Sequence, residues 1–175
     1  MTGPHHPKFK SVALRLRSLT EAPPVAPSAP DLAALPFNVR APAYLIASSH
    51  RRCWQCSSEV AVHALAVSPP FDRLDGSGQW QPGTRLAVLS YVECLLEPIN
   101  NYLMQIAPRY FRDESKWHVR PYWMNHCQHC GAKIGDYETI ESPGAPLNVD
   151  RLESSNVEFL QVPEPLGVLA ELIKT

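Results

Sequence analysis

The chain has 175 residues, of which 45% are hydrophobic and 19% charged, and this is ordinary for a globular protein of one domain with some extra length. A net charge of −1 and a pI of about 6.6 disfavour a dedicated nucleic-acid-binding protein, which would usually be more basic. No run approaches the roughly 18 apolar residues of a membrane-spanning helix, and the N-terminus lacks the apolar core of a signal peptide. We therefore expect a cytoplasmic protein that has no membrane partner.

The N-terminal region predicts an arm rather than a folded domain. Residues 12–19 alternate apolar and basic side chains, which is typical of an amphipathic strand. Residues 21–42 contain six prolines, and because proline lacks the amide donor this stretch should be neither a helix nor a central strand. It favours an extended linker or an arm that lies along the surface. We expect an arm and Pro-rich linker over residues 1–40 and a folded domain over residues 41–175.

The sequence of the first half of that domain predicts strands followed by a helix. Apolar, β-branched runs predict strands over residues 44–47, 60–67 and 85–92, and the turn-rich residues 68–83 predict a loop. Pro98 suits the first turn of a helix, so we expect a short helix over residues 99–107 that Pro108 ends.

The second half is expected to add three strands. Residues 117–123 predict a strand that leads into a cysteine pair, residues 134–140 a strand that leaves it, and residues 157–162 a last strand. Residues 166–173 favour a short terminal helix or docking segment.

The cysteines form the strongest motif. Cys53-Trp-Gln-Cys56 and Cys127-Gln-His-Cys130 are two C-x-x-C pairs with expected strands on either side. Two such pairs in a chain without a signal peptide indicate a metal site rather than a disulfide framework. Four thiolates predict one tetrahedral Zn²⁺ site. The turns that carry Cys53–Cys56 and Cys127–Cys130 are called the two knuckles here. The fold class we expect is α+β and β-rich: a split zinc ribbon with a strand and helix segment inserted between the two knuckles.

Two alternatives to four-thiolate ligation remain open. One C-x-x-C alone resembles a redox dithiol. The other is that His50, His126 or His129 replaces a thiolate, which is disfavoured because the C-x-x-C spacing places both of its sulfur atoms well for one ion. Cys94 lies apart from both pairs and is interpreted as a small buried hydrophobic residue, with a reactive thiol as the alternative. His63 is interpreted as a structural histidine in an apolar strand.

Basic residues flank both knuckles, and they allow two interpretations. They form either a solvated face or a surface that binds nucleic acid or a partner. The residues concerned are Arg51, Arg52, Arg109, Arg112, Lys116 and Arg120. The aromatic residues are interpreted mainly as core or knuckle-packing residues, and an exposed subset as a surface that stacks bases or anchors a partner. The set is Trp54, Trp80, Trp117, Tyr122 and Trp123.

Enzyme signatures are mostly absent from the sequence. The chain has no H-E-x-x-H, G-x-S-x-G or P-loop, and it lacks the H-x-E and P-C-x-x-C pair of zinc deaminases. Four thiolates would also leave no open coordination position for catalysis. Asp136, which follows Gly135, is interpreted as a turn residue rather than a catalytic acid.

The knuckle sequences resemble a group of poorly characterised bacterial zinc-ribbon proteins with CWxC and YWxNxCxHCGxxxGD segments. The matching pieces are Cys53–Cys56, Tyr122–Gly131 and Gly135-Asp136, within residues 41–146. The resemblance implies zinc and the split-ribbon plan but no function, and Ser57 stands where glycine is usual after the first knuckle.

These features together favour a non-enzymatic binding protein whose structural zinc site organises a surface for another protein. An immunity or antitoxin-type inhibitor fits the size and class. The first alternative is a nucleic-acid-binding ribbon, and the second is an accessory or regulatory subunit of an enzyme.

Overall fold

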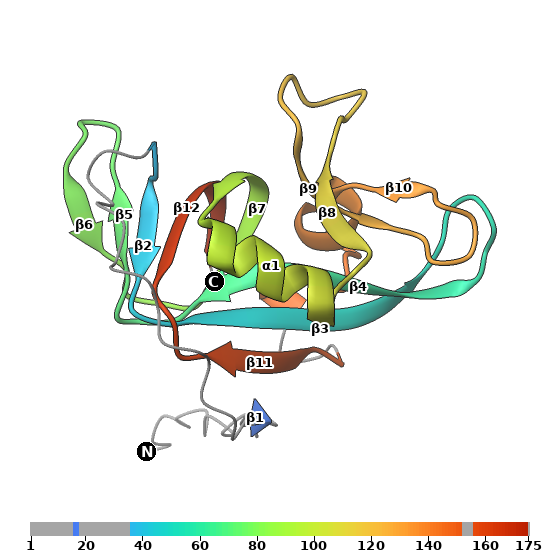
Figure 1. Ribbon diagram of the computed structural model, residues 1–175, viewed down its shortest axis with the longest axis horizontal. Coiled ribbons are helices and arrows are strands. Elements are labelled where there is room, and N and C mark those ends of the chain that lie inside the picture. The colour runs from blue at the N-terminus through green and yellow to red at the C-terminus, as the bar shows by residue number, and fades with distance from the viewer. Residues whose placement is uncertain (1–15, 18–35, 152–155, 175) are drawn as a thin grey trace, which may run out of the picture.

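The computed structural model describes residues 16–17, 36–151 and 156–174. These residues form a β-rich α+β fold with few helices, as the sequence predicts (Figure 1). The strands are β1 (Leu16–Arg17), β2 (Val39–Ala41), β3 (Tyr44–Arg52), β4 (Glu59–Val67), β5 (Asp72–Leu74), β6 (Trp80–Pro82), β7 (Ala87–Leu95), β8 (Tyr110–Asp113), β9 (Tyr122–His126), β10 (Lys133–Ile134), β11 (Glu158–Val162) and β12 (Leu166–Lys174). The helices are α1 (Glu97–Ile106), a π-helical turn (Tyr137–Glu141) and a 3₁₀ turn (Val149–Arg151).

The strands make two sheets. Sheet A has nine strands in the order β1-β11-β3-β4-β7-β12-β2-β5-β6, and sheet B has three in the order β10-β9-β8. All pairings are antiparallel except that of β1 with β11. The first cysteine pair lies in the turn between β3 and β4 of sheet A, and the second lies between β9 and β10 of sheet B. The two sheets must therefore meet for the cysteines to meet.

Sheet A is buried on both faces, which explains its nearly continuous apolar strands. Alternate residues of β3 enter different clusters: Tyr44 and Ile46 pack in the cluster that contains α1, while Leu45 and Ala47 pack in the other. The second cluster also contains Cys53 and Cys127. One face of sheet A thus supports the helix, and the opposite face supports both knuckles.

Two asparagine side chains form hydrogen bonds with backbone groups that a neighbouring strand does not pair. Asn125 of β9 accepts a bond from the His63 amide (2.8 Å) and donates to the His63 carbonyl (2.9 Å), so it joins sheet B to β4. Asn38 makes the same two bonds with Ala170 (2.9 and 2.7 Å), at the irregularity in the pairing of β12 with β7. Buried backbone groups without a ladder partner are satisfied in this way.

Most predicted elements before the second knuckle are present. Strands β3 and β4 cover the runs predicted over residues 44–47 and 60–67, and β3 extends to residue 52. Strand β7 begins two residues later than the predicted run 85–92 and extends to residue 95, and β11 begins one residue later than the predicted strand 157–162. Helix α1 has proline in its first turn and ends where the Ala107 amide bonds to the Leu103 carbonyl (2.8 Å), just before Pro108. The prediction of a short helix there is confirmed.

The prediction of a linker over residues 21–42 is wrong at its C-terminal end. Residues 39–41 form β2, which pairs with both β12 and β5, and Val39 and Ala41 are buried. Pro36 and Pro42 lie outside this strand, so its amides remain free to pair. The predicted domain division between residues 40 and 41 falls inside β2. Of the predicted strand over residues 12–19, only β1 is described, and the rest lies outside the described residues.

Three further predictions fail for local reasons. The predicted loop 68–83 contains the hairpin β5–β6, whose turn is held by Asp75, because its Oδ1 accepts the amides of Ser77 (2.9 Å) and Gln79 (3.0 Å). The strand predicted over residues 117–123 begins only at Tyr122, and its partner β8 was not predicted. After β10 the chain forms the π-helical turn instead of a strand to residue 140, since the Gly135 carbonyl accepts the amides of Glu138 and Thr139.

The predicted terminal helix over residues 166–173 is also wrong. This segment is β12, and it lies inside sheet A between β7 and β2. Its Leu, Ala and Glu residues favour a helix locally, but pairing along two neighbouring strands outweighs that weak preference. No helix in the described part of the chain has the length and apolar character needed to cross a bilayer.

Replacing Asn125 with alanine tests the join between the two sheets. The change leaves the His63 amide and carbonyl without partners beside a buried site, so we expect the free energy of unfolding to fall by about 2–4 kcal/mol. The measurement is urea unfolding of the metal-loaded protein. Asn101→Ala, at an exposed position in α1, is the matched control and should change stability by less than about 0.5 kcal/mol. Equal effects of the two variants would contradict the role of Asn125.

Candidate metal centre

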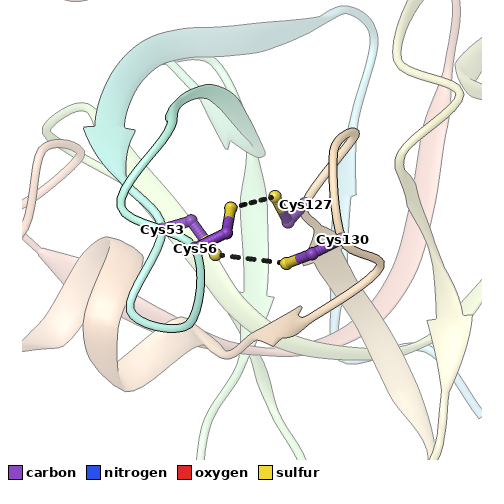
Figure 2. A group of neighbouring side chains, drawn as sticks. All are labelled: Cys53, Cys56, Cys127 and Cys130. Atoms are coloured by element: carbon purple, nitrogen blue, oxygen red, sulfur yellow. Dashed lines mark hydrogen bonds between the residues drawn. The ribbon is translucent and has the colours of Figure 1, made fainter.

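Four cysteine side chains from two distant turns converge on one point (Figure 2). The Sγ atoms of Cys53, Cys56, Cys127 and Cys130 all lie within 4.8 Å of one another. Across the two knuckles, Cys53 Sγ lies 3.7 Å from Cys130 Sγ and Cys56 Sγ lies 3.6 Å from Cys127 Sγ. A tetrahedral zinc site with Zn–S bonds of about 2.3 Å has S···S edges of about 3.8 Å. The sulfur atoms therefore have the spacing of a tetrahedral thiolate site.

The two knuckles share one backbone geometry. In the first, the Cys53 amide bonds to the Ser58 carbonyl and the Ser57 amide to the Cys53 carbonyl, both at 2.9 Å. In the second, Cys127 has the same two bonds, with the Ala132 carbonyl and the Gly131 amide, also at 2.9 Å. The amide two residues after the first cysteine points at its sulfur in both, with N···Sγ distances of 3.4 Å. The turns thus aim both sulfurs of each pair in the same direction.

Each knuckle needs one residue in the left-handed backbone region. Gly131 has φ 74°, and Ser57, at the same place in the first knuckle, has φ 62°. The glycine expected at position 57 by resemblance would adopt this conformation without strain, whereas serine adopts it at a cost. The departure at Ser57 therefore changes the energy of the turn but not its geometry.

Hydrogen-bond donors around the Cys56 sulfur favour its thiolate form. The Ser58 hydroxyl and amide donate to the Cys56 sulfur and lower the pKa of that thiol to about 6. Cys53 and Cys127 are buried on the sheet side, while Cys130 is exposed. All four cysteines are free, and the cross-knuckle S···S distances exceed the roughly 2.05 Å of a disulfide. The donor set is all sulfur, closed and tetrahedral, and this fits Zn²⁺.

The histidines considered as replacement ligands have other contacts or lie outside the group. His126 is buried, stacks on Phe111 with 3.7 Å between ring centroids, and has its Nε2 3.1 Å from Asp113 Oδ2. The metal-ligand group found among the described residues contains the four cysteines without His50, His126 or His129. Cys94 is half-buried on β7 and is not a member of the group.

Two side-chain contacts tie the knuckles together beside the sulfur atoms. Trp54, between the first two cysteines, donates from Nε1 to the Lys133 carbonyl that follows the second pair (2.9 Å). Arg51, just before the first pair, donates to the Glu138 carbonyl (2.7 Å) and lies 3.3 Å from the Glu138 carboxylate. The orientation of both side chains therefore depends on how the knuckles meet.

The basic residues noted in the sequence do not form one free patch. Arg51 is engaged by Glu138, and Arg52 by the Ser57 carbonyl at 3.4 Å. Arg112 donates to the Glu93 carbonyl (3.2 Å), and Arg120 lies 3.1 Å from the Glu93 carboxylate. Arg109 and Lys116 are exposed, and their side chains have no hydrogen-bond or ion-pair partner in the described part of the chain.

One buried polar cluster near the second knuckle was not anticipated. Asp136 is fully buried, its Oδ2 accepts the Tyr91 amide (2.7 Å), and burial raises the pKa of its carboxyl to about 8. Tyr91 has φ 47°, which is unusual for a bulky residue, and its ring stacks on His118. Asp136 is therefore more than a turn residue: it positions the backbone of β7 beneath the π-helical turn. The Gly135-Asp136 pair was the only sequence signal for it.

Comparison with protein-family models, curated proteins and solved structures gives no match for this chain. The class that the fold and site define is a β-rich α+β protein with a four-cysteine group suited to one metal ion.

Substitutions at the left-handed positions test the knuckle geometry. Gly131→Ala meets no atom within 4 Å of the new Cβ, so its cost is that of the backbone alone, and we expect a loss of about 1 kcal/mol in the free energy of unfolding. Ser57→Gly should raise stability by up to about 1 kcal/mol for the same reason. Gly144→Ala is the control, since that position has the same open surroundings without positive φ. Denaturant unfolding of the metal-loaded variants measures all three, and a stabilising Gly131→Ala would refute the shared geometry.

Proposed function

We propose that the protein binds one Zn²⁺ through Cys53, Cys56, Cys127 and Cys130, and that the ion is structural. The observation that carries this proposal is the convergence of four sulfur atoms within 4.8 Å from two matched turns. The arrangement supports the split zinc ribbon: two knuckles on separate sheets with β4 to β9 inserted between them. When bound, zinc would supply a cross-link between the sheets.

The proposed role is not catalytic. Four protein thiolates complete a tetrahedron and leave no position for water or substrate, which catalytic zinc sites require. The amides that donate to Cys53 and Cys127 and the Ser58 donors to Cys56 stabilise charge on the ligands rather than activate a nucleophile.

We infer that the zinc site organises a surface that binds another protein. Trp54 supports this view, because its side chain is 59% exposed although its indole N–H is fixed by the bond to Lys133. A rigid, exposed tryptophan is a frequent anchor at protein interfaces. Tyr137, 63% exposed, lies on the π-helical turn that Arg51 holds from the first knuckle. Both aromatic residues depend on knuckle contacts for their positions.

A protein partner is favoured over nucleic acid because several basic side chains are already engaged. Arg51, Arg112 and Arg120 contact Glu138 or Glu93, which lowers their availability for phosphate. An inhibitor of the immunity or antitoxin type is the class we propose. An accessory or regulatory subunit of an enzyme is the remaining alternative.

Metal analysis of the protein purified without added metal should give about one zinc per chain. Each of Cys53→Ser, Cys56→Ser, Cys127→Ser and Cys130→Ser should lose the ion and most of the stability, because structural zinc contributes on the order of 10 kcal/mol of apparent binding energy. Cys94→Ala is the control and should keep full zinc content. Zinc lost from that variant, or retained in all four others, would refute the ligand assignment.

Parallel binding assays test the choice of partner. We expect no appreciable binding to single- or double-stranded oligonucleotides at physiological salt, because phosphate binding requires free basic residues and falls steeply with salt. A protein partner identified by pull-down from the host should bind again when both components are pure. Trp54→Ser should weaken that complex at least tenfold, whereas Met104→Ser, at another exposed apolar position, should not change it.

Sub-micromolar oligonucleotide binding that disappears in an Arg51→Glu, Arg52→Glu double variant would favour the nucleic-acid alternative. If neither assay detected binding, the accessory-subunit alternative would take precedence. The zinc measurement is independent of both, so failure of the partner assignment would leave the structural site intact.

A further inference from the structure

The loop between β8 and β9 exposes two apolar side chains almost completely. Trp117 is 96% exposed and Val119 is 99% exposed, more than any other large hydrophobic residue in the described part of the chain. The loop projects away from both sheets (Figure 1). Exposed apolar patches rimmed by polar residues mark protein or membrane interaction sites.

The loop has a defined shape that turns these two side chains outward. The Ser115 hydroxyl oxygen accepts the amides of Trp117 (3.1 Å) and His118 (3.2 Å), which fixes the turn. His118, which lies between the two apolar residues, points back to the body and stacks on Tyr91 with 4.6 Å between ring centroids. Holding His118 inward therefore presents Trp117 and Val119 on the outside.

Residues 115–121, which form the tip itself, contain two cations, and two carboxylates lie at its base. Lys116 precedes Trp117 and Arg120 follows Val119, and residues 115–121 contain no carboxylate. Glu93, the acidic group against the base of the loop, is contacted by Arg120 at 3.1 Å and by His118 at 3.7 Å. The exposed Glu114 precedes the tip, and its carbonyl accepts the Lys133 ammonium (2.8 Å). The tip thus combines an apolar end with the cation of Lys116 on one side and the Arg120–Glu93 ion pair on the other.

The shape of the tip decides which kind of partner fits. A stable protein interface covers about 800 Å² on each partner, and a projecting turn with two exposed side chains offers much less. Single-stranded nucleic acid binds along basic grooves with several stacking platforms, whereas Val119 has no π face. A lipid interface needs no matching surface: it accepts tryptophan at headgroup level and attracts flanking basic residues when the lipids are anionic.

We propose that the β8–β9 loop is a peripheral docking element that inserts Trp117 and Val119 into the interface of an anionic bilayer. Lys116 lies beside the phosphates in this arrangement, while Arg120 keeps its contact with Glu93. The sequence-based expectation of no membrane partner rested on the lack of a spanning segment, and peripheral insertion needs none. The proposal is independent of the protein-binding surface proposed around Trp54, because it uses a different element.

Vesicle co-sedimentation of the full zinc-loaded chain tests the proposal. We expect binding to phosphatidylcholine vesicles that contain about 30% phosphatidylserine, at least tenfold stronger than binding to pure phosphatidylcholine. The double variant Trp117→Ser, Val119→Ser should lose at least tenfold of that binding. Lys116→Gln should lose about fivefold, as expected for one cation near an anionic surface. Tryptophan emission should shift to shorter wavelength with vesicles, and this shift should be absent in Trp117→Phe.

Met104→Ser is the matched control, since Met104 is 59% exposed on α1, and it should bind vesicles as the unchanged protein does. Because Trp117 and Val119 are almost fully exposed, the double variant should keep the unfolding midpoint and zinc content of the parent. No vesicle binding, equal binding to neutral vesicles, or full binding by the double variant would each overturn the proposal. Loss of oligonucleotide or purified-partner binding in the double variant, without vesicle binding by the parent, would assign the loop to that ligand instead.

Discussion

The meeting of two C-x-x-C turns is the constraint on which the rest of the structure depends. One turn joins β3 to β4 in sheet A, the other joins β9 to β10 in sheet B, and residues 57–126 lie between them. Bringing the ends of such a long segment together costs chain entropy, and local turn preferences alone are too weak to compensate for it. A four-thiolate metal site would offset that cost, and its ligands are placed by the strands on either side of each turn.

The inner side of the sulfur cluster packs against the hydrophobic core. Cys53 and Cys127, the first residue of each pair, are buried and pack with Val62, Ala64 and Ile134 against one face of sheet A. Asn125 fastens sheet B to β4 only two residues before Cys127. The second cysteine of each pair is more exposed, so the site has a rigid inner half and an outer half facing solvent. This asymmetry is what would let a structural ion also shape the surface.

The outer surface has two separate features at different distances from the sulfur atoms. Trp54 and Arg51 lie at the knuckles and contact the opposite side of the site, so their orientation follows the way the two knuckles meet. The β8–β9 loop is instead fixed by Ser115 and by the stack of His118 on Tyr91, whose backbone is held by Asp136. Loss of metal should therefore disturb the two surfaces to different degrees.

The sequence by itself determined what short-range chemistry can encode. The spacing of Cys53, Cys56, Cys127 and Cys130 indicated the group of four, because two residues between cysteines give a bite that suits one ion. The apolar runs of β3, β4 and β7 and the proline at the start of α1 also predicted their elements correctly. Tertiary structure decided the rest. Strand β12 favours a helix locally but is a strand because it pairs with β7 and β2. Strand β2 lies in the expected linker, and the chain turns after Ile134, the last residue of β10, instead of continuing as a strand. Those outcomes depend on partners far away in the chain, and no local pattern contains that information.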